Sequence, residues 1–332
     1  MLFRSYKNNY QNTTSRVLRN TTNFTAKLLG ERLTLNGDIT FRYNDERIEG
    51  KQTPVPYSQS VGKINYAGAG YNSIMNTLSN TKYLATNVYA QYNQLFANTH
   101  DVKAMIGYNY EQSIYNYDFE RRNGLLFDDA ENINMATGSI SINSDYQKWR
   151  IAGGFFRLNY GYKDRYLVEI NGRYDGSSKF PIDQQWAFFP SASAGWRVSQ
   201  EPFWKISPKV VSDLKIRASY GSLGNGNISP YQFQELFKIY IQNRLLKGEK
   251  PTTTSSPNPI PTSLTWKTAT TANVGVDISF LNGRLKFVGD YYIRKNKDMY
   301  VTGTQLPAVY GADAPKGNYA DMTTKGWELT LT

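Results

Sequence analysis

The feature that most constrains this chain is a two-residue alternation of apolar and polar side chains that recurs along its length. Between residues 33 and 43, odd positions carry the apolar set Leu33, Leu35, Ile39, Phe41 and Tyr43, whereas even positions carry Thr34, Asn36, Asp38, Thr40 and Arg42. Because successive side chains of a β-strand point to opposite faces, the pattern is typical of a strand with one apolar and one polar face. No comparable stretch places apolar residues at helical spacing. The sequence therefore predicts an all-β chain.

The alternation predicts about eleven strands in an antiparallel, up-and-down order. Their expected ranges are 22–29, 33–43, 82–96, 101–119, 149–162, 166–178, 186–199, 213–224, 266–280, 284–300 and 322–332. Short turns are expected at 29–32, 97–101, 163–165 and 282–283, and longer loops at 44–80, 120–148, 225–265 and 301–320. Two connections depart from this alternation of short turns and long loops: 179–185 is short for a loop, and 200–212 is long for a turn. Outer-membrane barrels keep short turns on one side and long loops on the other, which a soluble sandwich has no reason to do.

Composition removes several classes of chemistry. The 332 residues include no cysteine and one histidine, His100, which we expect in a solvated turn. Thiol chemistry and cysteine-held metals are therefore excluded, and histidine-based catalysis would rest on one side chain. No run of about eighteen apolar residues exists, which excludes a transmembrane helix, although alternating barrel strands remain compatible with low mean hydropathy. The formal charge of +11 comes from scattered Lys and Arg, which favours solvated faces over a nucleic-acid-binding stripe.

Five sequence blocks, in order, resemble the SusC/RagA family of TonB-linked (TonB-dependent) outer-membrane proteins. The most specific block is FFRLNYGYKDRYLVEINGRYDGSSKF at 155–180, and the others lie at 186–203, 214–232, 264–300 and 318–332. The similarity is strong over 155–332, and weaker but compatible before it. It implies an antiparallel up-and-down transmembrane β-barrel of roughly 22 strands with a plugged lumen, of which this sequence is a part.

The resemblance also implies a location, a function and partners. It implies a barrel segment of a nutrient importer in the bacterial outer membrane, surrounded by lipid. An N-terminal plug would contact TonB, and a SusD-like surface lipoprotein would close the barrel over an oligosaccharide or peptide. We expect residues 1–332 to be part of the barrel domain, with the plug, the signal peptide and C-terminal strands absent. We expect no cofactor, no metal, no nucleic-acid partner and no enzymatic activity. The alternatives are a passive porin or surface adhesin and, from another class, an outer-membrane hydrolase.

The sequence offers structural and binding candidates but no catalytic ones, because a serine nucleophile would need a nearby base. Asp-Gly forms turns and hydroxyls bond nearby backbone groups, so structural roles are expected for Asp175, Gly176, Ser177, Ser178, Gly224 and Asn225. Either a lumen or the outside of a soluble sheet would accommodate the charged set, and we assign to the lumen Glu169, Arg173, Lys215, Arg217, Asp277, Asp290 and Arg294. Tyr and Trp near both strand ends match barrel girdles. Three aromatic residues lie in or next to predicted outer loops, where their rings could stack on sugars: Trp186, Tyr231 and Trp266.

Overall fold

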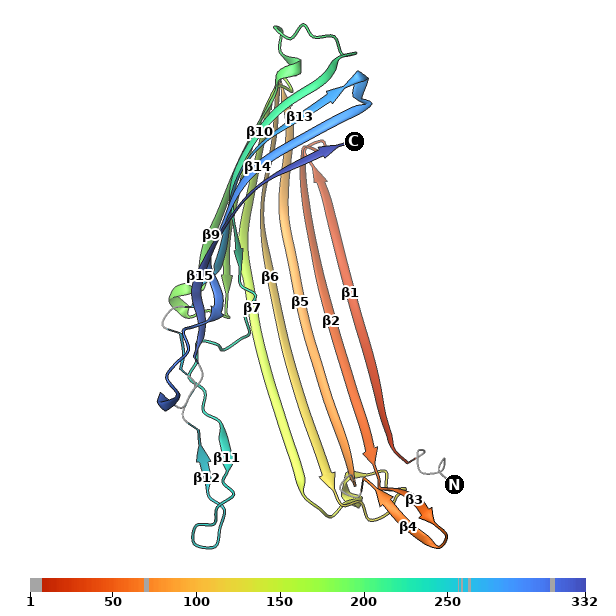
Figure 1. Cartoon of the computed structure of the whole chain (residues 1–332). Coiled ribbons are helices and arrows are strands. Elements are labelled where there is room, and N and C mark those ends of the chain that lie inside the picture. The colour runs from red at the N-terminus through yellow and green to blue at the C-terminus, as the bar shows by residue number, and fades with distance from the viewer. Residues whose placement is uncertain (1–7, 69–71, 256, 258, 262–263, 311–313) are drawn as a thin grey trace. The chain divides into compact units, whose positions relative to one another are not determined.

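The chain folds around one eleven-stranded sheet, in a computed structural model that describes residues 8–68, 72–255, 257, 259–261, 264–310 and 314–332. The strands are β1 (Tyr10–Leu28), β2 (Leu33–Gln52), β5 (Ser73–Phe96), β6 (His100–Asn123), β7 (Ile140–Tyr162), β8 (Tyr166–Ser177), β9 (Trp186–Arg197), β10 (Val211–Asn225), β13 (Lys267–Phe280), β14 (Leu285–Thr302) and β15 (Lys316–Leu331). Their order in the sheet follows their order in the chain (Figure 1). The predicted antiparallel sheet of eleven strands is confirmed.

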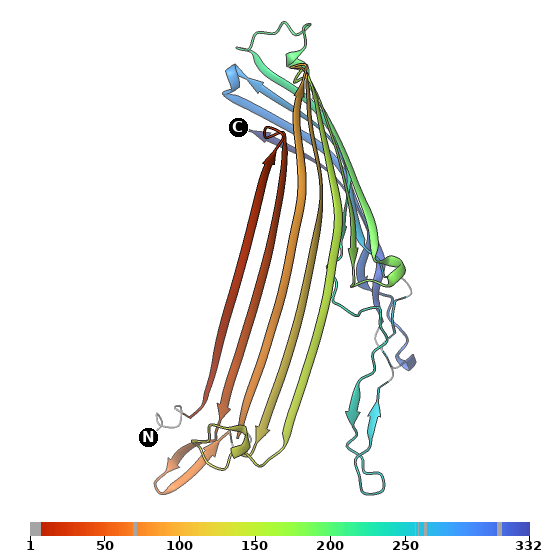
Figure 2. The same ribbon diagram turned by 180° about the vertical axis from the view of Figure 1, so that it is seen from behind.

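Small elements occupy the connections. Two ribbons are β3 (Val55–Ser60) with β4 (Lys63–Ala67), and β11 (Ile239–Ile241) with β12 (Thr252–Thr254). The second ribbon extends past the loop-side ends of β8 and β9 (Figures 1 and 2). The 3-10 turns are η2 (Ile133–Met135), η3 (Ile182–Gln184), η4 (Val198–Gln200), η5 (Leu281–Gly283) and η6 (Ala308–Tyr310), and the described residues form no α-helix. Both ribbons lie in segments that the sequence predicted as loops.

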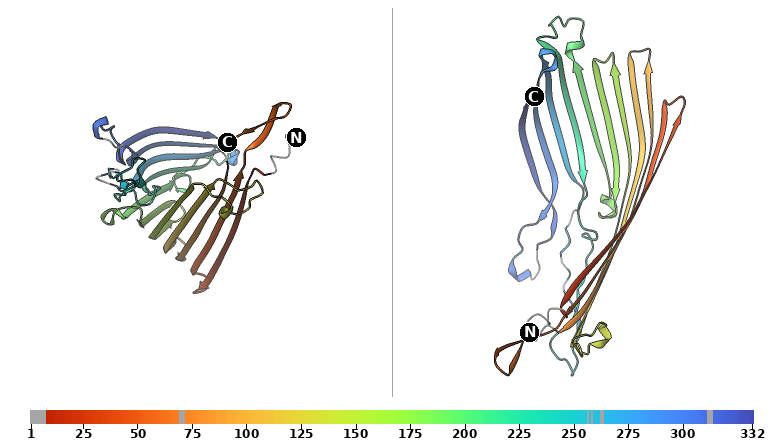
Figure 3. Two further views of the ribbon diagram at one scale, coloured as in Figure 1. Left: turned by 90° about the horizontal axis from the view of Figure 1, so that it is seen from below. Right: turned by 90° about the vertical axis from the view of Figure 1, so that its right-hand side faces the viewer.

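The chain divides into two compact units. One comprises Met1–Thr22, Asp38–Thr86 and Glu111–Trp149, and the other comprises Asn23–Gly37, Asn87–Tyr110 and Arg150–Thr332. The first unit has a small core made by Ile74, Leu125, Ala130 and Ala136. The second unit contains all four predicted short turns and strands β8 to β15, of which β13 to β15 run side by side in blue in Figure 3.

Local backbone geometry explains the short turns. Lys163 and Asp164, between β7 and β8, both have positive φ, at 49° and 56°. They are the two central residues of a tight turn that the amide of Arg165 closes on the carbonyl of Tyr162 at 2.9 Å, and positive φ at both central residues matches the right-handed twist of the flanking strands. The β13–β14 turn differs from its prediction, because Leu281 joins Asn282 and Gly283 in the left-handed region, which lengthens the expected two-residue turn.

The strands are longer at their loop ends than predicted. β1 begins at Tyr10 instead of residue 22, and β2 continues to Gln52 instead of ending at residue 43. β5 and β6 each have 24 residues, about twice what a tilted strand needs to cross a bilayer. Backbone pairing therefore continues well into segments that were expected to be loops.

Candidate functional site

The two faces of the sheet from β8 to β14 differ in chemistry. Ile170 of β8 lies opposite Ala192 of β9, and the same register places Glu169 opposite Ser193. Because side chains alternate, Ile170 and Glu169 point to opposite faces. The register continues across β10, β13 and β14, so all seven charged residues assigned to the lumen share the face that carries Glu169. We call this the polar face and the other the apolar face.

A row of aromatic residues lies at the turn-side end of the apolar face. The ring of Tyr166 stacks on those of Tyr162 and Trp196, with centroid distances of 6.3 and 6.5 Å. Phe203 meets Trp196 edge-on at 6.4 Å, and His100 packs on Tyr162 at 5.1 Å. Rings with an apolar body and a polar tip suit a boundary between lipid and water.

His100 therefore differs from the solvated turn residue predicted for it. It is the first residue of β6, and its Nδ1 lies 2.8 Å from the hydroxyl of Tyr160. The strand begins one residue earlier than the alternation indicated, because a polar histidine gives no apolar signal. His100 belongs to the aromatic row.

A buried carboxylate fixes the same row from the β9–β10 turn. Glu201 accepts a hydrogen bond from Nε1 of Trp196 at 3.0 Å and pairs with Arg165, whose Nη1 lies 3.4 Å from Oε2. Hydrogen bonds from Tyr166 and Trp196 hold the pKa of Glu201 below its usual value. Glu201 carries no signal of this role in the sequence, since the role depends on the proximity of strand ends that are distant in sequence.

A second aromatic pair lies at the loop-side end of the apolar face. The indole of Trp186 stacks on Tyr174 at 5.2 Å and covers Gly176, where a β-carbon would come within 2.6 Å of the indole. Trp186 was expected next to an outer loop, at the start of the predicted strand 186–199, and it is the first residue of β9, where it pairs with Gly176 of β8.

Aliphatic side chains fill the belt between the two aromatic groups. Val168, Ile170 and Val274 are exposed there by 40%, 43% and 58% of their surface. From Tyr166 to Tyr174 the strand rises about 26 Å at about 3.3 Å per residue, or about 20 Å along the normal if the strand tilts by about 40°. Exposed aliphatic surface of this height, bounded by aromatic rings, matches the lipid-facing band of an outer-membrane barrel.

The polar face carries an ion cluster centred on Arg217. Its Nη1 and Nη2 donate to the two carboxylate oxygens of Asp290 at 2.8 and 2.6 Å, and its Nε donates to Asp277 at 3.0 Å. Nδ2 of Asn273 also donates to Asp290, at 2.9 Å. Gly275 lies between Arg217 and Asp290 in the register, so the guanidinium crosses β13 where no side chain intervenes.

A similar cluster forms around Arg173. Its guanidinium donates to both oxygens of Asp175, at 3.0 and 2.8 Å, and to Oδ1 of Asn109 at 2.9 Å. A β-carbon on Gly153 would overlap the carboxylate of Asp175. Neither Gly153 nor Gly275 was predicted from the sequence, although a glycine with polar-face parity beside an arginine is a recognisable signal once the register is known.

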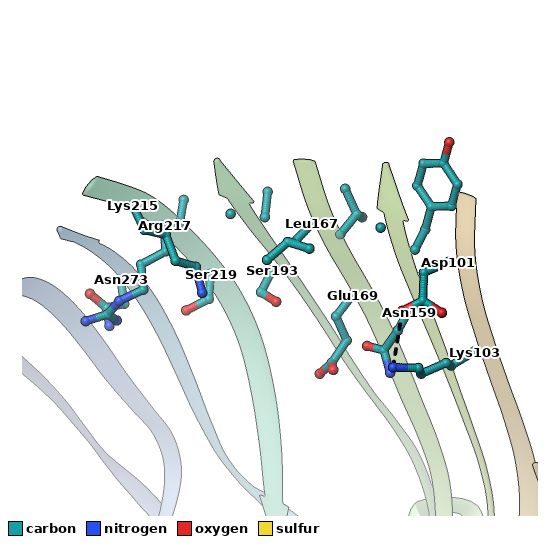
Figure 4. Close-up of a pocket in the computed structure, with 16 residues that line it drawn as sticks. Asp101, Lys103, Asn159, Leu167, Glu169, Ser193, Lys215, Arg217, Ser219 and Asn273 are labelled. Carbon is teal, nitrogen blue, oxygen red and sulfur yellow. Dashed lines mark ion pairs between the residues drawn. The ribbon is translucent and has the colours of Figure 1, made fainter. Parts of the chain in front are cut away.

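Glu169 and Lys215, with Arg217, line a hollow of about 470 Å³ on the polar face. Figure 4 shows Glu169, Asn159 and the Asp101–Lys103 ion pair on one side, and Lys215, Arg217 and Asn273 on the other. Small residues form the floor between them, including Ser193, Gly195 and Ser219. Arg294, farther along the face, donates to Thr271 at 3.3 Å and packs over Tyr292.

The Asp-Gly-Ser-Ser motif lies at the end of a strand, as the predicted range 166–178 placed it. Asp175 and Gly176 are the last but two and last but one residues of β8, paired with Ala187 and Trp186. The predicted hydroxyl bonds to backbone do form: Ser177 Oγ accepts from the Lys179 amide and Ser178 Oγ accepts from the Arg150 amide.

Gly224 and Asn225 end β10 in ways that fit a structural role. A β-carbon on Gly224 would overlap the ring of Phe189, so only glycine allows this close packing. Oδ1 of Asn225 accepts a hydrogen bond from the amide of Asn227 at 2.8 Å, which turns the chain away from the strand.

The outer loops of the second unit are built on a buried cluster. Phe180, Phe189, Leu264 and Trp266 pack together and are exposed by 0 to 7%. Nε1 of Trp266 donates to the carbonyl oxygen of Gln185 at 2.9 Å. Substrate contact was predicted for Trp266, but burial of its ring contradicts this role. The tryptophan instead ties the β8–β9 loop to the start of β13.

Tyr231 is the one aromatic candidate that lines an outer cavity among the described residues. It has a positive φ of 65° and borders a hollow of about 210 Å³ together with Gln232, Gln234 and Tyr300. The hydroxyl of Tyr300 donates to Oε1 of Gln232 at 3.0 Å, which holds one wall in place. Substrate contact by Tyr231 stays a prediction.

The described ranges contain no group of three or more acidic or histidine side chains that could hold a metal ion. In the same ranges, no helix is long and apolar enough to cross a membrane.

Comparison with known proteins gives consistent results. The sequence model of a family described as TonB dependent receptor-like, beta-barrel matches residues 2–332. The TonB-dependent receptor P26 of Formosa agariphila is 33% identical over 285 residues, which cover 85% of this chain and 28% of that protein. The TonB-dependent receptor SusC of Bacteroides thetaiotaomicron is 34% identical over 293 residues, which cover 86% and 28%. The solved structure of the RagAB peptide transporter superposes with a TM-score of 0.80 at 20% identity, over 98% of this chain and 35% of the other. The chain thus spans little more than a quarter of the curated relatives.

Proposed function

The chain belongs to the TonB dependent receptor-like β-barrel family, whose members SusC and RagA resemble it, and from this premise we propose that it forms part of the wall of an active nutrient importer. Such barrels lie in the bacterial outer membrane. The family is one of receptors and transporters, so the proposal assigns no catalytic step and no cofactor to this chain.

The observation that carries the proposal is the difference between the two faces of one sheet. The apolar face has an exposed aliphatic belt between two groups of aromatic residues, which suits lipid. The polar face has charges joined in clusters around Arg173 and Arg217, with a hollow between them, which suits a wet interior that another protein segment enters. A soluble sheet would gain nothing from an aliphatic belt that is exposed to water.

Other parts of the importer are proposed from the family. We place residues 1–332 within the barrel domain of a longer protein, in which a plug contacts TonB inside the lumen. A SusD-like surface lipoprotein would close the loop side over an oligosaccharide or peptide. The seven charged residues of the polar face would then line the lumen, and Tyr231 would be the loop residue best placed to meet the substrate.

The experiment compares uptake by cells that carry the full-length gene, cells that lack it and cells that lack TonB. Labelled oligosaccharides and peptides of graded length serve as probes. We expect uptake of one class to disappear in both deletions. Uptake that requires the gene but survives loss of TonB would instead support the passive porin, and uptake of neither class would argue against import.

A further inference from the structure

Three lysines lie on the apolar face, where the aliphatic belt ends on β14 and β15. Lys295 and Lys297 share the parity of Tyr291, and Lys325 of β15 lies opposite Ile293 in the register. All three residues are exposed. Lys295 pairs with a residue of β13 on one side and of β15 on the other, so two neighbouring strands fix the face that it occupies. Positive charge therefore lies on the face that suits lipid.

The height of these lysines matches the headgroup layer of a bilayer. On β14 the belt runs from Leu285 to Ile293, which is as many residues as it has on β8. Lys295 and Lys297 follow at the next two positions of the same parity, about 5 and about 10 Å farther along the normal for a strand tilted by about 40°. Headgroups occupy about 5–8 Å on each side of the hydrocarbon, and a lysine chain bends its ammonium towards such a layer.

Hydroxyl groups flank the lysines on the neighbouring strands. Thr270 of β13 and Thr323 of β15 lie directly opposite Lys295, and Thr268 of β13 lies opposite Lys297. Ammonium and hydroxyl groups are the donors that phosphate oxygens accept from. Their arrangement across three strands therefore suits a phosphate group at the level of the headgroups.

The charges of the lysines are not neutralised within the described residues. Ion pairs on β13 and β14 engage Arg217 on the polar face and none of the three lysines in the part of the chain that the structure describes. Close by in the register, the carboxylate of Asp321 accepts a hydrogen bond from the amide of Asp298 at 3.0 Å. An anionic ligand consequently meets three ammonium groups and one carboxylate that is already hydrogen-bonded.

A hollow of about 510 Å³ opens in the belt on the turn side of the lysines. Its floor consists of small side chains: Ala192, Ala194, Ala218 and Ala272. Tyr291 and Ile293 form its wall on β14, and Ile293 is only two residues from Lys295. The hollow and the lysines thus follow one another along one face, in the order of the acyl chain and the headgroup of a membrane lipid.

We propose that β13 to β15 form a binding site for a phosphorylated lipid of the outer leaflet. Lys295 and Lys297 bind the phosphate oxygens, Thr270 and Thr323 donate hydroxyl hydrogen bonds to them, and an acyl chain lies in the hollow. The site depends on the assignment of the apolar face to lipid and of the long loops to the outside of the cell, and it does not depend on transport. A lipid held there anchors this side of the barrel at a fixed height.

The experiment titrates the full-length protein in detergent with lipid A, an acylated sugar that carries phosphates, and measures bound lipid by native mass spectrometry. The same lipid without its phosphates and inorganic phosphate serve as comparison probes. The test variant combines Lys295→Gln with Lys297→Gln. The matched control combines Lys267→Gln with Lys286→Gln, which removes the same charge from the polar face of β13 and β14. Heat-modifiable migration on gels establishes that each barrel is folded.

We expect the test variant to bind lipid A at least about tenfold more weakly, and the control to stay within about threefold of the unchanged protein. Lys295→Arg with Lys297→Arg should also stay within about threefold, because the charges remain. Removal of the lipid phosphates should weaken binding to the unchanged protein at least about tenfold. Ala218→Phe, which fills the hollow without changing the charge, should weaken binding of lipid A by at least about threefold.

Four results overturn the site: equal affinity of the test and control variants, equal affinity for the lipid with and without phosphates, unchanged binding by Ala218→Phe, or no binding by the unchanged, folded protein. Displacement of lipid A by an equal concentration of inorganic phosphate overturns it too, because the lysines would then bind the free anion and not the lipid. Each of these results leaves the assignment of the apolar face to lipid intact, since substitution of Ile170 tests that assignment separately.

Discussion

Replacement of Gly275 by alanine tests whether the Arg217 cluster needs a bare backbone beneath it. A β-carbon there would lie 2.6 Å from Oδ1 of Asp290, 2.7 Å from Cζ of Arg217 and 2.9 Å from its Nη1. Each distance is shorter than a carbon contact permits, so the guanidinium and the carboxylate must separate. The two hydrogen bonds between them would be lost or lengthened.

The expected loss follows from the exposure of the pair. The side chains of Arg217 and Asp290 are exposed by 29% and 15%, so the pair is intermediate between a surface and a buried ion pair. A surface ion pair contributes up to about 1 kcal/mol to stability, and breaking a buried one costs about 3–5 kcal/mol. We take about 2–3 kcal/mol for the loss. Alanine offsets about 0.5–1 kcal/mol of this loss, because it loses less backbone conformational entropy than glycine when the strand folds. The net cost is about 1–2.5 kcal/mol of unfolding free energy.

The assay is equilibrium unfolding of the full-length protein in detergent and urea. Gly154→Ala is the control, because a β-carbon at Gly154 of β7 meets no heavy atom within 4 Å. We expect this control to be neutral or slightly stabilising. In an Arg217→Met background, Gly275→Ala should lose most of its cost. A cost that persists in that background, or one no larger than that of Gly154→Ala, would refute the reasoning.

Three further changes probe the lipid belt, the loop core and the turn. Ile170→Arg, in the exposed belt, should destabilise the barrel in the membrane by about 2–4 kcal/mol and lower the yield of assembled barrel, whereas Asn171→Arg on the polar face should be tolerated. Equal yields of heat-modifiable protein from the two variants would contradict the assignment of the two faces. Trp266→Ala should lower the free energy of unfolding by about 3–5 kcal/mol and speed proteolysis within residues 226–266. An unchanged cleavage rate would contradict a buried loop core. Because the pKa of Glu201 is lowered, its stabilisation of the turn is complete above its usual value of 4.5 and is lost as the pH falls below it. Protease sensitivity of the turn should rise on acidification and become independent of pH in Glu201→Gln.

Alternation predicted the strands where the two faces meet different surroundings, and failed where they do not. Leu214, Ile216 and Ala218 alternate with charged residues in the belt region, and β10 was placed within two residues of its observed start. The first thirteen of the 19 residues of β1 read YQNTTSRVLRNTT, which is polar at both parities apart from Val17 and Leu18, and all of these residues after Tyr10 are exposed. Backbone pairing stabilises this stretch without any difference between its faces, so a pattern of side chains cannot reveal it.

The contacts of aromatic residues near the strand ends were harder to predict than the strands themselves. Trp186 and Trp266 both follow segments that are rich in turn formers, yet one stacks on Tyr174 at the sheet surface and the other is buried beneath two loops. Burial of Trp266 depends on Phe180 and Phe189, which are more than 75 residues away in sequence by the printed numbering. Local sequence holds no record of such a contact, so aromatic residues in long loops cannot be sorted into core and binding roles from sequence alone.

The polar face adds a constraint that alternation does not express. Each of its two arginine clusters lies beside a glycine on a neighbouring strand, Gly275 for Arg217 and Gly153 for Arg173. Any larger side chain at these positions would collide with the carboxylate partner, Asp290 or Asp175. The charged side chains consequently lie flat along the sheet instead of projecting from it. This arrangement leaves free volume next to the polar face. A solvated outer face does not require its charged side chains to lie flat. A lumen that holds a second protein segment does, because upright side chains would occupy the space of that segment.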